Sequence, residues 1–261
     1  MLLTFDVGNT ETTLGLYEGE SLRGHWRVMT DVPRTPDEIG VLLRGLLAGA
    51  EIPLAGVTGA VIGSVVPRVT EPLADACRKL LPKGRVELID ARSALPITLA
   101  VDEPLTVGAD RIINTLAASR RYGRDAIVVD LGTATTFDCI TKDAVFLGGV
   151  IAPGVTTSAE TLFRRTSKLP ATELVAPART IGTRTEECIR AGVMFGAAES
   201  IDGIVRRIKA EWPNASTPIV IGTGGLAELF ASICTSFDEV DPYLTLYGLS
   251  LAFELVGREA M

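Results

Sequence analysis

A strand, a tight turn containing aspartate and glycine, and a second strand occur twice in this chain. Residues 2–17 read LLTFDVGNTETTLGLY, in which an apolar run reaches Asp6 and a glycine turn and is followed by alternating apolar and polar positions. Residues 127–138 read IVVDLGTATTFD and repeat the pattern around Asp130. Such patterns favour strands, and glycine permits the turn between them. Because the two aspartates stand 124 positions apart in a chain of 261 residues, the repeat predicts two lobes.

The order of predicted elements supports the same division. The first half reads strand, strand, strand, helix, strand, helix, strand, and its first helix begins with Thr35 as N-cap and Glu38 closing a capping box. The second half again opens with three strands, at 126–130, 135–141 and 145–151, before its helices. No linker separates the halves, so we expect lobes at residues 1–123 and 124–261.

Composition narrows the class of protein. With 47% hydrophobic residues and a formal charge of −7, from 25 basic and 32 acidic side chains, the chain has no clustered positive charge for a nucleic-acid partner. Its four cysteines are widely spaced and it has one histidine, so neither a disulfide framework nor a zinc site is expected. No signal peptide precedes Asp6, and the longest uncharged runs fall short of the ~20 residues of a membrane span. We expect a cytoplasmic protein with no membrane partner.

Three glycine-rich turns each follow a predicted strand, at residues 6–10, 130–133 and 222–225. Ligands of α/β proteins bind at the carboxyl ends of strands, so three such turns favour a nucleotide held between the lobes. No G-x-x-x-x-G-K-[ST] motif occurs, which excludes a P-loop. Main-chain N–H groups, the hydroxyls of Thr10 and Thr133, and a cation near Asp6 or Asp130 would therefore neutralise the phosphates.

Gly108-Ala109-Asp110-Arg111 begins a predicted helix and has two interpretations. Asp110 is a favourable first-turn residue that interacts with the helix dipole. It could also accept a hydroxyl proton while Arg111 meets negative charge. Thr183 and Thr185 open another helix, and capping is the simple explanation for both.

Taken together, the motifs closely resemble those of type III pantothenate kinases. In order, they are Asp6-x-Gly8-Asn9-Thr10, Gly108-x-Asp110-Arg111, Asp130-x-Gly132-Thr133-Ala134-Thr135-Thr136, Gly148-Gly149 with Pro153-Gly154, and Gly222-Thr223-Gly224-Gly225. The resemblance runs over essentially the whole chain. It implies a duplicated ribonuclease-H-like fold of the actin-like ATPases, an α/β architecture of two lobes with mixed five-stranded sheets flanked by helices. It also implies a homodimer with pantothenate pockets near the subunit interface.

The resemblance also implies roles for individual residues. Asp110 would be the catalytic proton acceptor, Asp6 would hold magnesium with ATP, and Asp130 would hold a monovalent cation, K⁺ or NH₄⁺. Pantothenate would contact Gly108, Ala109, Asp110, Arg111 and Thr185. ATP would contact Asp6, Val7, Gly8, Asn9, Thr10, Glu11, Thr12, Thr13 and Thr133. The chain departs from the family pattern at Val101, Arg184, Arg190 and Ala191.

These features favour phosphorylation of pantothenate by MgATP to 4′-phosphopantothenate, the first step of coenzyme A biosynthesis. Two alternatives remain: a non-catalytic regulator on the same scaffold, or another actin-like kinase acting on a sugar or acetate. All three aspartates of the motifs are present, which disfavours the regulator. The helix from Thr185 to Lys209 is a candidate dimer surface because Gly192, Gly196 and Ala197 permit close approach, although its burial within one lobe fits equally well.

Overall fold

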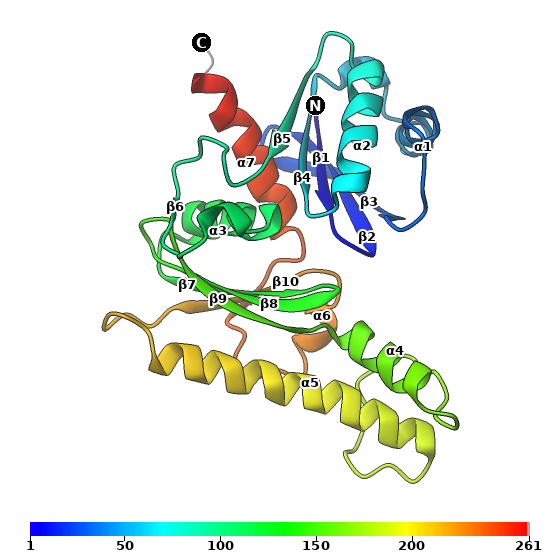
Figure 1. The fold of residues 1–261 in the computed structure, drawn as a ribbon, viewed down its shortest axis with the longest axis vertical. Helices are drawn as coiled ribbons and strands as arrows, with labels where there is room; N and C mark the ends of the chain where they lie inside the picture. The colour runs from blue at the N-terminus through cyan, green and yellow to red at the C-terminus, as the bar shows by residue number, and fades with distance from the viewer. Residues whose placement is uncertain (260–261) are drawn as a thin grey trace. The chain divides into compact units, whose positions relative to one another are not determined.

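The computed structural model describes residues 1–259 and divides into two compact units (Figure 1). Unit 1 contains Met1–Arg120 and the chain from Leu244 onwards, and unit 2 contains Arg121–Tyr243. Each unit is built around its own sheet and its own cluster of buried apolar side chains. Across the described residues, no helix has the length and apolar character that crossing a membrane would require.

Unit 1 has a mixed five-stranded sheet in the order β3-β2-β1-β4-β5. Its strands are β1 (Leu2–Val7), β2 (Glu11–Glu18), β3 (Ser21–Met29), β4 (Gly59–Ser64) and β5 (Arg85–Ile89). The first three pair antiparallel, whereas β4 is parallel to both β1 and β5. The connecting segments contain three short elements. They are the two-residue strand β6 (Thr98–Leu99) and two 3-10 turns, at Leu54–Gly56 and Pro104–Thr106.

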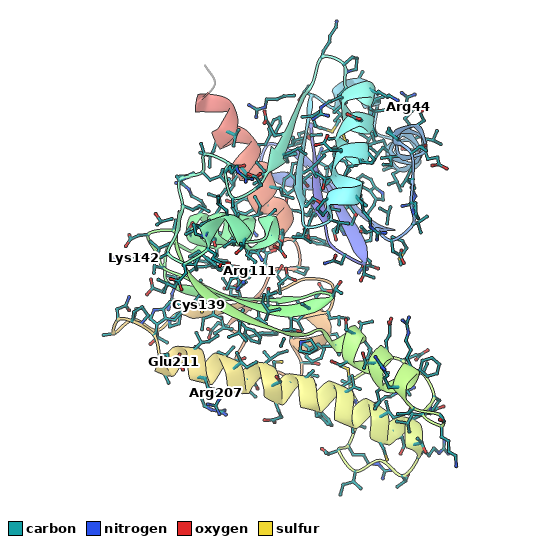
Figure 2. All side chains as sticks on the ribbon, viewed as in Figure 1. Arg44, Arg111, Cys139, Lys142, Arg207 and Glu211 are labelled. Atoms are coloured by element: carbon teal, nitrogen blue, oxygen red, sulfur yellow. The ribbon has the colours of Figure 1, made fainter. Side chains whose placement is uncertain are left out.

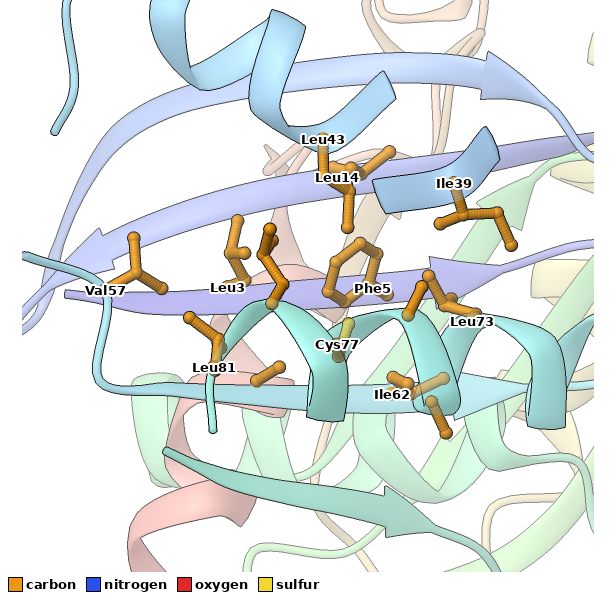
Figure 3. Close-up of a cluster of buried hydrophobic side chains, with 14 of the residues drawn as sticks. Leu3, Phe5, Leu14, Ile39, Leu43, Val57, Ile62, Leu73, Cys77 and Leu81 are labelled. Carbon is orange, nitrogen blue, oxygen red and sulfur yellow. The ribbon is translucent and has the colours of Figure 1, made fainter. Parts of the chain in front are cut away.

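Helices α1 (Pro36–Gly49) and α2 (Pro67–Leu80) pack against the same core in unit 1. The predicted capping box is confirmed, because the Thr35 hydroxyl accepts a hydrogen bond from Glu38 N while the Glu38 carboxylate accepts one from Thr35 N. Figure 3 shows the apolar side chains that converge between these helices and the sheet, including Phe5, Leu14, Ile39, Leu43, Leu73 and Cys77. Burial of this face, rather than helix propensity alone, holds the helices in place.

Unit 2 repeats the arrangement with β7 (Ala126–Leu131), β8 (Ala134–Ile140), β9 (Val145–Pro153), β10 (Ile219–Thr223) and β11 (Glu239–Val240). Its helices are α4 (Val155–Arg165), α5 (Thr185–Ala210) and the single turn α6 (Ala227–Phe230). The long helix α5, yellow in Figure 1, buries Met194, Ala198, Ile201 and Val205 in the core of this unit. One face of the helix the sequence proposed for dimerisation is therefore occupied within its own unit.

The two sheets have the same connectivity, as the predicted duplicated fold requires. Among the strands of unit 2 the order is β9-β8-β7-β10-β11, which matches β3-β2-β1-β4-β5 strand for strand. The antiparallel and parallel pairings also match. A register shift lies in the corresponding place in both, at Leu16/Tyr17 and at Cys139/Ile140. The repeat detected in the sequence is thus a repeat of topology.

The two remaining helices, α3 (Ala109–Tyr122) and α7 (Leu244–Glu259), fall largely in unit 1. The sequence division at 1–123 and 124–261 placed α7 in the C-terminal lobe, and the structure differs here, because α7 contacts β1, β2 and β4. Small residues permit this packing: a Cβ on Gly59 would lie 2.4 Å from the Phe253 ring, and one on Gly248 would lie 2.6 Å from Ile113. Tertiary close packing, which no local pattern reveals, decides where the last helix goes.

Candidate active site

The first glycine turn connects β1 to β2 in unit 1. Gly8 N donates to Glu11 O over 3.1 Å, and a Cβ on Gly8 would lie 3.0 Å from that same oxygen. Thr30 N donates to Thr10 O over 2.8 Å, which fixes the tip of the turn from the end of β3. Asn9, Thr10 and Glu11 are exposed. The turn therefore presents short polar side chains and main-chain atoms to a ligand.

Strand register separates the predicted nucleotide residues into two groups. Asp6 pairs with Thr13 of β2 and Gly63 of β4, so these three positions share one face of the sheet. Val7 and Thr12 point to the other face: Val7 is buried in the core, and the Thr12 hydroxyl lies 2.7 Å from the hydroxyl of Thr30. Only the main chain at Val7 and Thr12 is left to meet a ligand on the Asp6 side.

Asp110 is held at the beginning of α3 by its neighbours. Its Oδ1 accepts a hydrogen bond of 2.9 Å from Arg111 N. A Cβ on Gly108 would lie 2.4 Å from the same oxygen, so glycine is needed at that position. Burial raises the pKa of Asp110, and the opposing effects of the Arg111 backbone hydrogen bond and guanidinium charge only partly offset it. A raised pKa makes this carboxylate a stronger base than an exposed aspartate.

The end of β4 brings the Asp6 turn and the Asp110 helix to the same edge of unit 1. Val65 N donates to Val7 O over 3.1 Å, and Val65 Cγ1 lies 3.3 Å from the Cβ position of Gly108. On the Asp6 face, the Cβ position of Gly63 lies 3.8 Å from Cβ of Ala109. The sequence interpretation assigned no role to Gly63 or Val65, because a buried apolar strand carries no signal of what packs on its end.

In unit 2 the second turn is packed against the beginning of α4. Gly132 N donates to Ala134 O over 3.0 Å, while Thr133 O accepts from Gly154 N at 3.2 Å and from the Thr157 hydroxyl at 2.7 Å. A Cβ on Gly154 would lie 2.3 Å from Thr133 O. Thr157 was not identified from the sequence, because it lies inside a helix and outside any glycine motif.

The third turn closes around Asp130. Gly224 has a φ of +87°, and a Cβ there would lie 2.4 Å from Asp130 Oδ1 and 2.9 Å from Leu131 N. Thr223 is the register partner of Asp130, and its fully buried hydroxyl makes no hydrogen bond. A carboxylate and a buried, unbonded hydroxyl therefore occupy paired positions at the ends of two neighbouring strands.

Metal binding at Asp6 would follow a different pattern. Within residues 1–259, no three His, Cys, Asp or Glu side chains gather into a metal cluster. Mg²⁺ in nucleotide sites is usually held by one or two carboxylates, water and the phosphates themselves. Asp6, at the end of β1 and facing the side on which α3 begins, fits that sparse donor set.

Thr185 opens α5 in unit 2 and is exposed. Just before the helix, the Glu187 Oε2 atom accepts hydrogen bonds from the backbone N and the hydroxyl of Thr183, over 2.8 Å and 3.1 Å. Arg184 is the N-cap residue and makes no side-chain capping bond. Side-chain capping of the helix backbone therefore accounts for neither threonine, although Thr183 is bound to Glu187.

Comparison with known proteins decides the family. The family model for type III pantothenate kinase matches residues 2–207. A type III pantothenate kinase of Acidothermus cellulolyticus is 43% identical over 254 residues, covering 97% of this chain and 98% of the relative. One from Roseiflexus castenholzii is 45% identical over 257 residues, covering 98% and 99%. The chain belongs to the type III pantothenate kinase family.

Solved structures show the same fold at low identity. A structure titled as a conserved putative Baf family transcriptional activator from Campylobacter jejuni superposes with a TM-score of 0.60 at 18% identity, covering 98% of this chain and 99% of that one. A putative 2-dehydro-3-deoxygalactonokinase from Sinorhizobium meliloti gives a TM-score of 0.58 at 14% identity, covering 98% and 96%. These matches confirm the predicted actin-like architecture.

Against the type III pantothenate kinase pattern, the departures fall mainly in unit 2. Arg190 has a buried Nε with no hydrogen-bond partner, and its neighbour Ala191 is buried against the unit 2 core side of α5. Arg184 stands beside the exposed Thr185. Val101, the remaining departure, lies in an irregular stretch of unit 1.

Proposed function

We propose that this chain transfers the γ-phosphoryl group of ATP to the primary hydroxyl of pantothenate, giving 4′-phosphopantothenate and ADP in the first step of coenzyme A biosynthesis. Membership of the type III pantothenate kinase family supports this activity. The observation that carries the mechanism is Asp110, a carboxylate with raised pKa fixed at the first turn of α3. A non-catalytic regulator would have no need for such a group.

Asp110 acts on the acceptor hydroxyl. Because Arg111 N uses only one acceptor position of the carboxylate, Asp110 can still accept a hydrogen bond from the pantothenate hydroxyl. As the hydroxyl oxygen bonds to the γ-phosphorus and the bond to the β–γ bridging oxygen breaks, the hydroxyl proton passes to Asp110. In a loose transition state the positioning of that hydroxyl contributes as much as the proton transfer, and Asp110 performs both tasks.

Two turns meet the phosphates in this proposal. Gly8, Asn9 and Thr10 offer main-chain and side-chain donors at the end of β1, with Glu11 and Thr13 at the start of β2 beside them. Thr133 offers the corresponding hydroxyl in unit 2. Asp6 would hold Mg²⁺ together with the nucleotide, and that ion supplies positive charge against the phosphate oxygens. The exposure of Asn9, Thr10 and Thr133 is consistent with ligand contact.

Asp130 would hold K⁺ or NH₄⁺. Its carboxylate, the unsatisfied Thr223 hydroxyl and the glycine backbone at Gly224 provide the oxygen donors. A weakly hydrated monovalent cation there would offset the negative charge of a bound nucleotide. The acidic composition of the chain makes such local neutralisation necessary.

Pantothenate would lie against the Gly108–Arg111 segment and Thr185. Arg111 supplies positive charge at the start of α3, and Thr185 supplies a hydroxyl that helix capping does not use. Because pantothenate carries a carboxylate, at least one cationic group is expected among its contacts. Thr185→Ala should therefore raise the KM for pantothenate and leave the KM for ATP unchanged.

The active form in this proposal is a homodimer. Gly192 and Gly196 are exposed on α5 with open space beyond their Cα atoms, so a second helix can approach closely. Phe163 on the neighbouring helix α4 and Ile181 before α5 are also exposed, at 46% and 81%. Gly196→Arg should shift the protein to a monomer in analytical ultracentrifugation, whereas Gly45→Arg on α1 should not.

The deciding experiment is an acceptor panel. ADP release is coupled to NADH oxidation in the presence of MgATP and K⁺, with pantothenate, acetate and a set of hexoses as acceptors. Turnover that depends on pantothenate supports the proposal. Turnover with a sugar or acetate in its place would reassign the chain to another kinase activity, and no turnover with any acceptor would favour the regulator.

A further inference from the structure

Unit 1 contains a cavity of about 170 Å³ on the sheet face opposite Asp6. It lies between β1–β3 and helices α1 and α2, beside the side chains drawn in Figure 3. Phe5, Thr12 and Leu14 line it from the sheet, and Leu42, Leu43 and Leu73 line it from the helices. Cavities of about 150 Å³ with apolar walls hold a benzene-sized molecule. The space therefore suits one ring or a short branched chain.

The mouth of this cavity is apolar and open. Met29 and Val32, on the segment from the end of β3 to the start of α1, line the cavity and are 43% and 46% exposed. Pro33, which follows them, also lines it and is exposed. Exposure of several apolar side chains at the rim of a hollow is typical of a binding site rather than of random surface.

Two arginines give this mouth positive charge. Arg34 lines the cavity and is held in place by a hydrogen bond of 2.8 Å from its Nη1 to Met29 O. Arg68, at the start of α2, also lines the cavity and forms no ion pair with another described side chain. In an acidic chain, two guanidinium groups beside an apolar hollow select for an anion, and guanidinium pairs with carboxylates particularly well.

We propose that this cavity binds a small carboxylate with an aromatic or branched aliphatic body. The body fills the space between the sheet and the helices, and the carboxylate meets Arg68 and Arg34 at the mouth. This site is separate from the proposed kinase site, since its lining comes from the opposite face of β1 and β2. The proposal does not depend on which acceptor the enzyme phosphorylates.

Occupancy should also be felt at the nucleotide turn. Thr12 and Thr30 both line the cavity and bond to one another, and Thr30 N donates to Thr10 O at the tip of the turn. A ligand that contacts this pair restricts the motion of the turn. Binding in the cavity and ATP binding at the turn are then coupled, and each ligand changes the affinity for the other by the same factor. Benzoate should therefore alter the KM for ATP in the wild-type protein.

Benzoate is the probe, and binding is measured by ¹H–¹⁵N NMR titration of the full chain. We expect a dissociation constant of about 1 mM for a ligand of this size, with shifts centred on Thr12 and Thr30. Benzamide, which has the same shape without the charge, should bind at least about tenfold more weakly. Arg68→Gln should weaken benzoate by about tenfold, whereas Arg44→Gln should not, because Arg44 is exposed on α1 and outside the cavity (Figure 2).

A second variant tests the cavity itself. Leu42→Phe places a ring in the hollow and should abolish both the benzoate shifts and the effect of benzoate on the KM for ATP, while kcat with pantothenate and the circular dichroism spectrum stay at wild-type values. Equal binding of benzoate by the wild type, Arg68→Gln and Leu42→Phe would overturn the proposal. Equal binding of benzamide and benzoate would also overturn it. So would the absence of chemical-shift changes at a benzoate concentration 20-fold above the expected dissociation constant. An unchanged KM for ATP at saturating benzoate would overturn the coupling.

Discussion

The chain leaves the central parallel strand differently in the two units, although their sheets share one topology. After β4 in unit 1, Ser64 Oγ accepts from Val66 N at 3.1 Å and from the Thr70 hydroxyl at 2.7 Å, and the chain enters the 14-residue helix α2. After β10 in unit 2, Gly224 takes a positive φ against Asp130 and leads only to the four-residue helix α6. Unit 2 thereby brings a glycine backbone against its aspartate, whereas unit 1 begins a helix at the corresponding point.

The positions before the first strands differ in a similar way. Met1 O accepts from Thr58 N at 2.8 Å, and Asp125 O accepts from Ile219 N at 2.9 Å, so each residue bonds to the chain at the start of the neighbouring parallel strand. The Met1 amine binds Gly56 O, whereas the Asp125 carboxylate collects donors from Lys142 N, Trp212, Asn214 and Ser216. The two units therefore share a sheet topology but bind the residue before the first strand with different groups.

The largest expected effect is on kcat and comes from Asp110, which has no counterpart in unit 2. Asp110→Asn should lower kcat by about 100-fold or more, because the amide cannot accept the hydroxyl proton. Asp102→Asn, an exposed change in the same unit, is the matched control. Steady-state kinetics with pantothenate and MgATP measures both variants, and near wild-type turnover in Asp110→Asn would refute the catalytic assignment.

The Asp125 cluster should dominate the stability of unit 2. Burial by itself would raise the pKa of Asp125, but hydrogen bonds from Ser216, Trp212, Lys142 N and Asn214 outweigh it and lower the pKa to about 2. Asp125→Ala should reduce the free energy of unfolding by about 2 kcal/mol at pH 7, measured by urea denaturation. Asp143→Ala, exposed in the following turn, should change it little.

The sign of the pH dependence follows from the lowered pKa. Asp125 stabilises the folded state fully above the ordinary aspartate pKa near 4, and this contribution is lost as the pH falls toward 2. The difference in unfolding free energy between wild type and Asp125→Ala should therefore shrink below pH 4. A difference that stays constant from pH 7 to pH 3 would contradict the assignment.

Gly224→Ala tests the glycine turn that distinguishes unit 2. The new Cβ meets Asp130 Oδ1 at 2.4 Å in a backbone conformation with φ of +87°, so we expect about 1–3 kcal/mol of destabilisation and a raised K⁺ concentration for half-maximal activity. Gly45→Ala in α1 has open space around it and should stabilise by up to about 1 kcal/mol. If Gly224→Ala needs the same K⁺ concentration as the wild type for half-maximal activity, the Gly224 turn does not take part in cation binding.

The smallest expected effect is a gain of stability at the active site. Because the pKa of Asp110 is raised, the ionised carboxylate destabilises the folded state; stability is greater below the ordinary aspartate pKa and falls as the pH rises through the folded value. Asp110→Asn should therefore be more stable than wild type at pH 7.5, by about 1 kcal/mol, with a smaller gain at pH 4.5. Equal stability of the two proteins at pH 7.5 would argue against the burial of this charge.

Local sequence patterns predicted the helices and strands well, but they did not predict which distant segments pack against each other. The Thr35 capping box, the three antiparallel strands of each half and the start of α3 at Ala109 depend on residues close in sequence, and all are present. The order of elements predicted a strand between the first two helices, where β4 lies, but not that Val65 would touch the Gly108 segment. Contacts between distant segments leave no periodic signal in a single sequence.

The glycine motifs marked the turns of the proposed active site without fixing which side chains face a ligand. Asp6 and Thr12 stand close together in one motif, yet strand register directs them to opposite faces. Thr157 and Thr223 adjoin the Asp130 region through packing and pairing that join segments far apart in the chain. Side-chain direction follows from register, which is decided by the whole sheet.

The sequence by itself determined the duplicated order of strands and helices, the family and the three aspartate-bearing motifs, because these are properties of residue type and spacing along the chain. The tertiary structure alone decided that α7 packs in unit 1, that Asp125 gathers four donors, that burial raises the pKa of Asp110 and that a cavity lies behind the first turn. These features depend on volume, burial and dielectric environment, which exist only after distant residues have packed together.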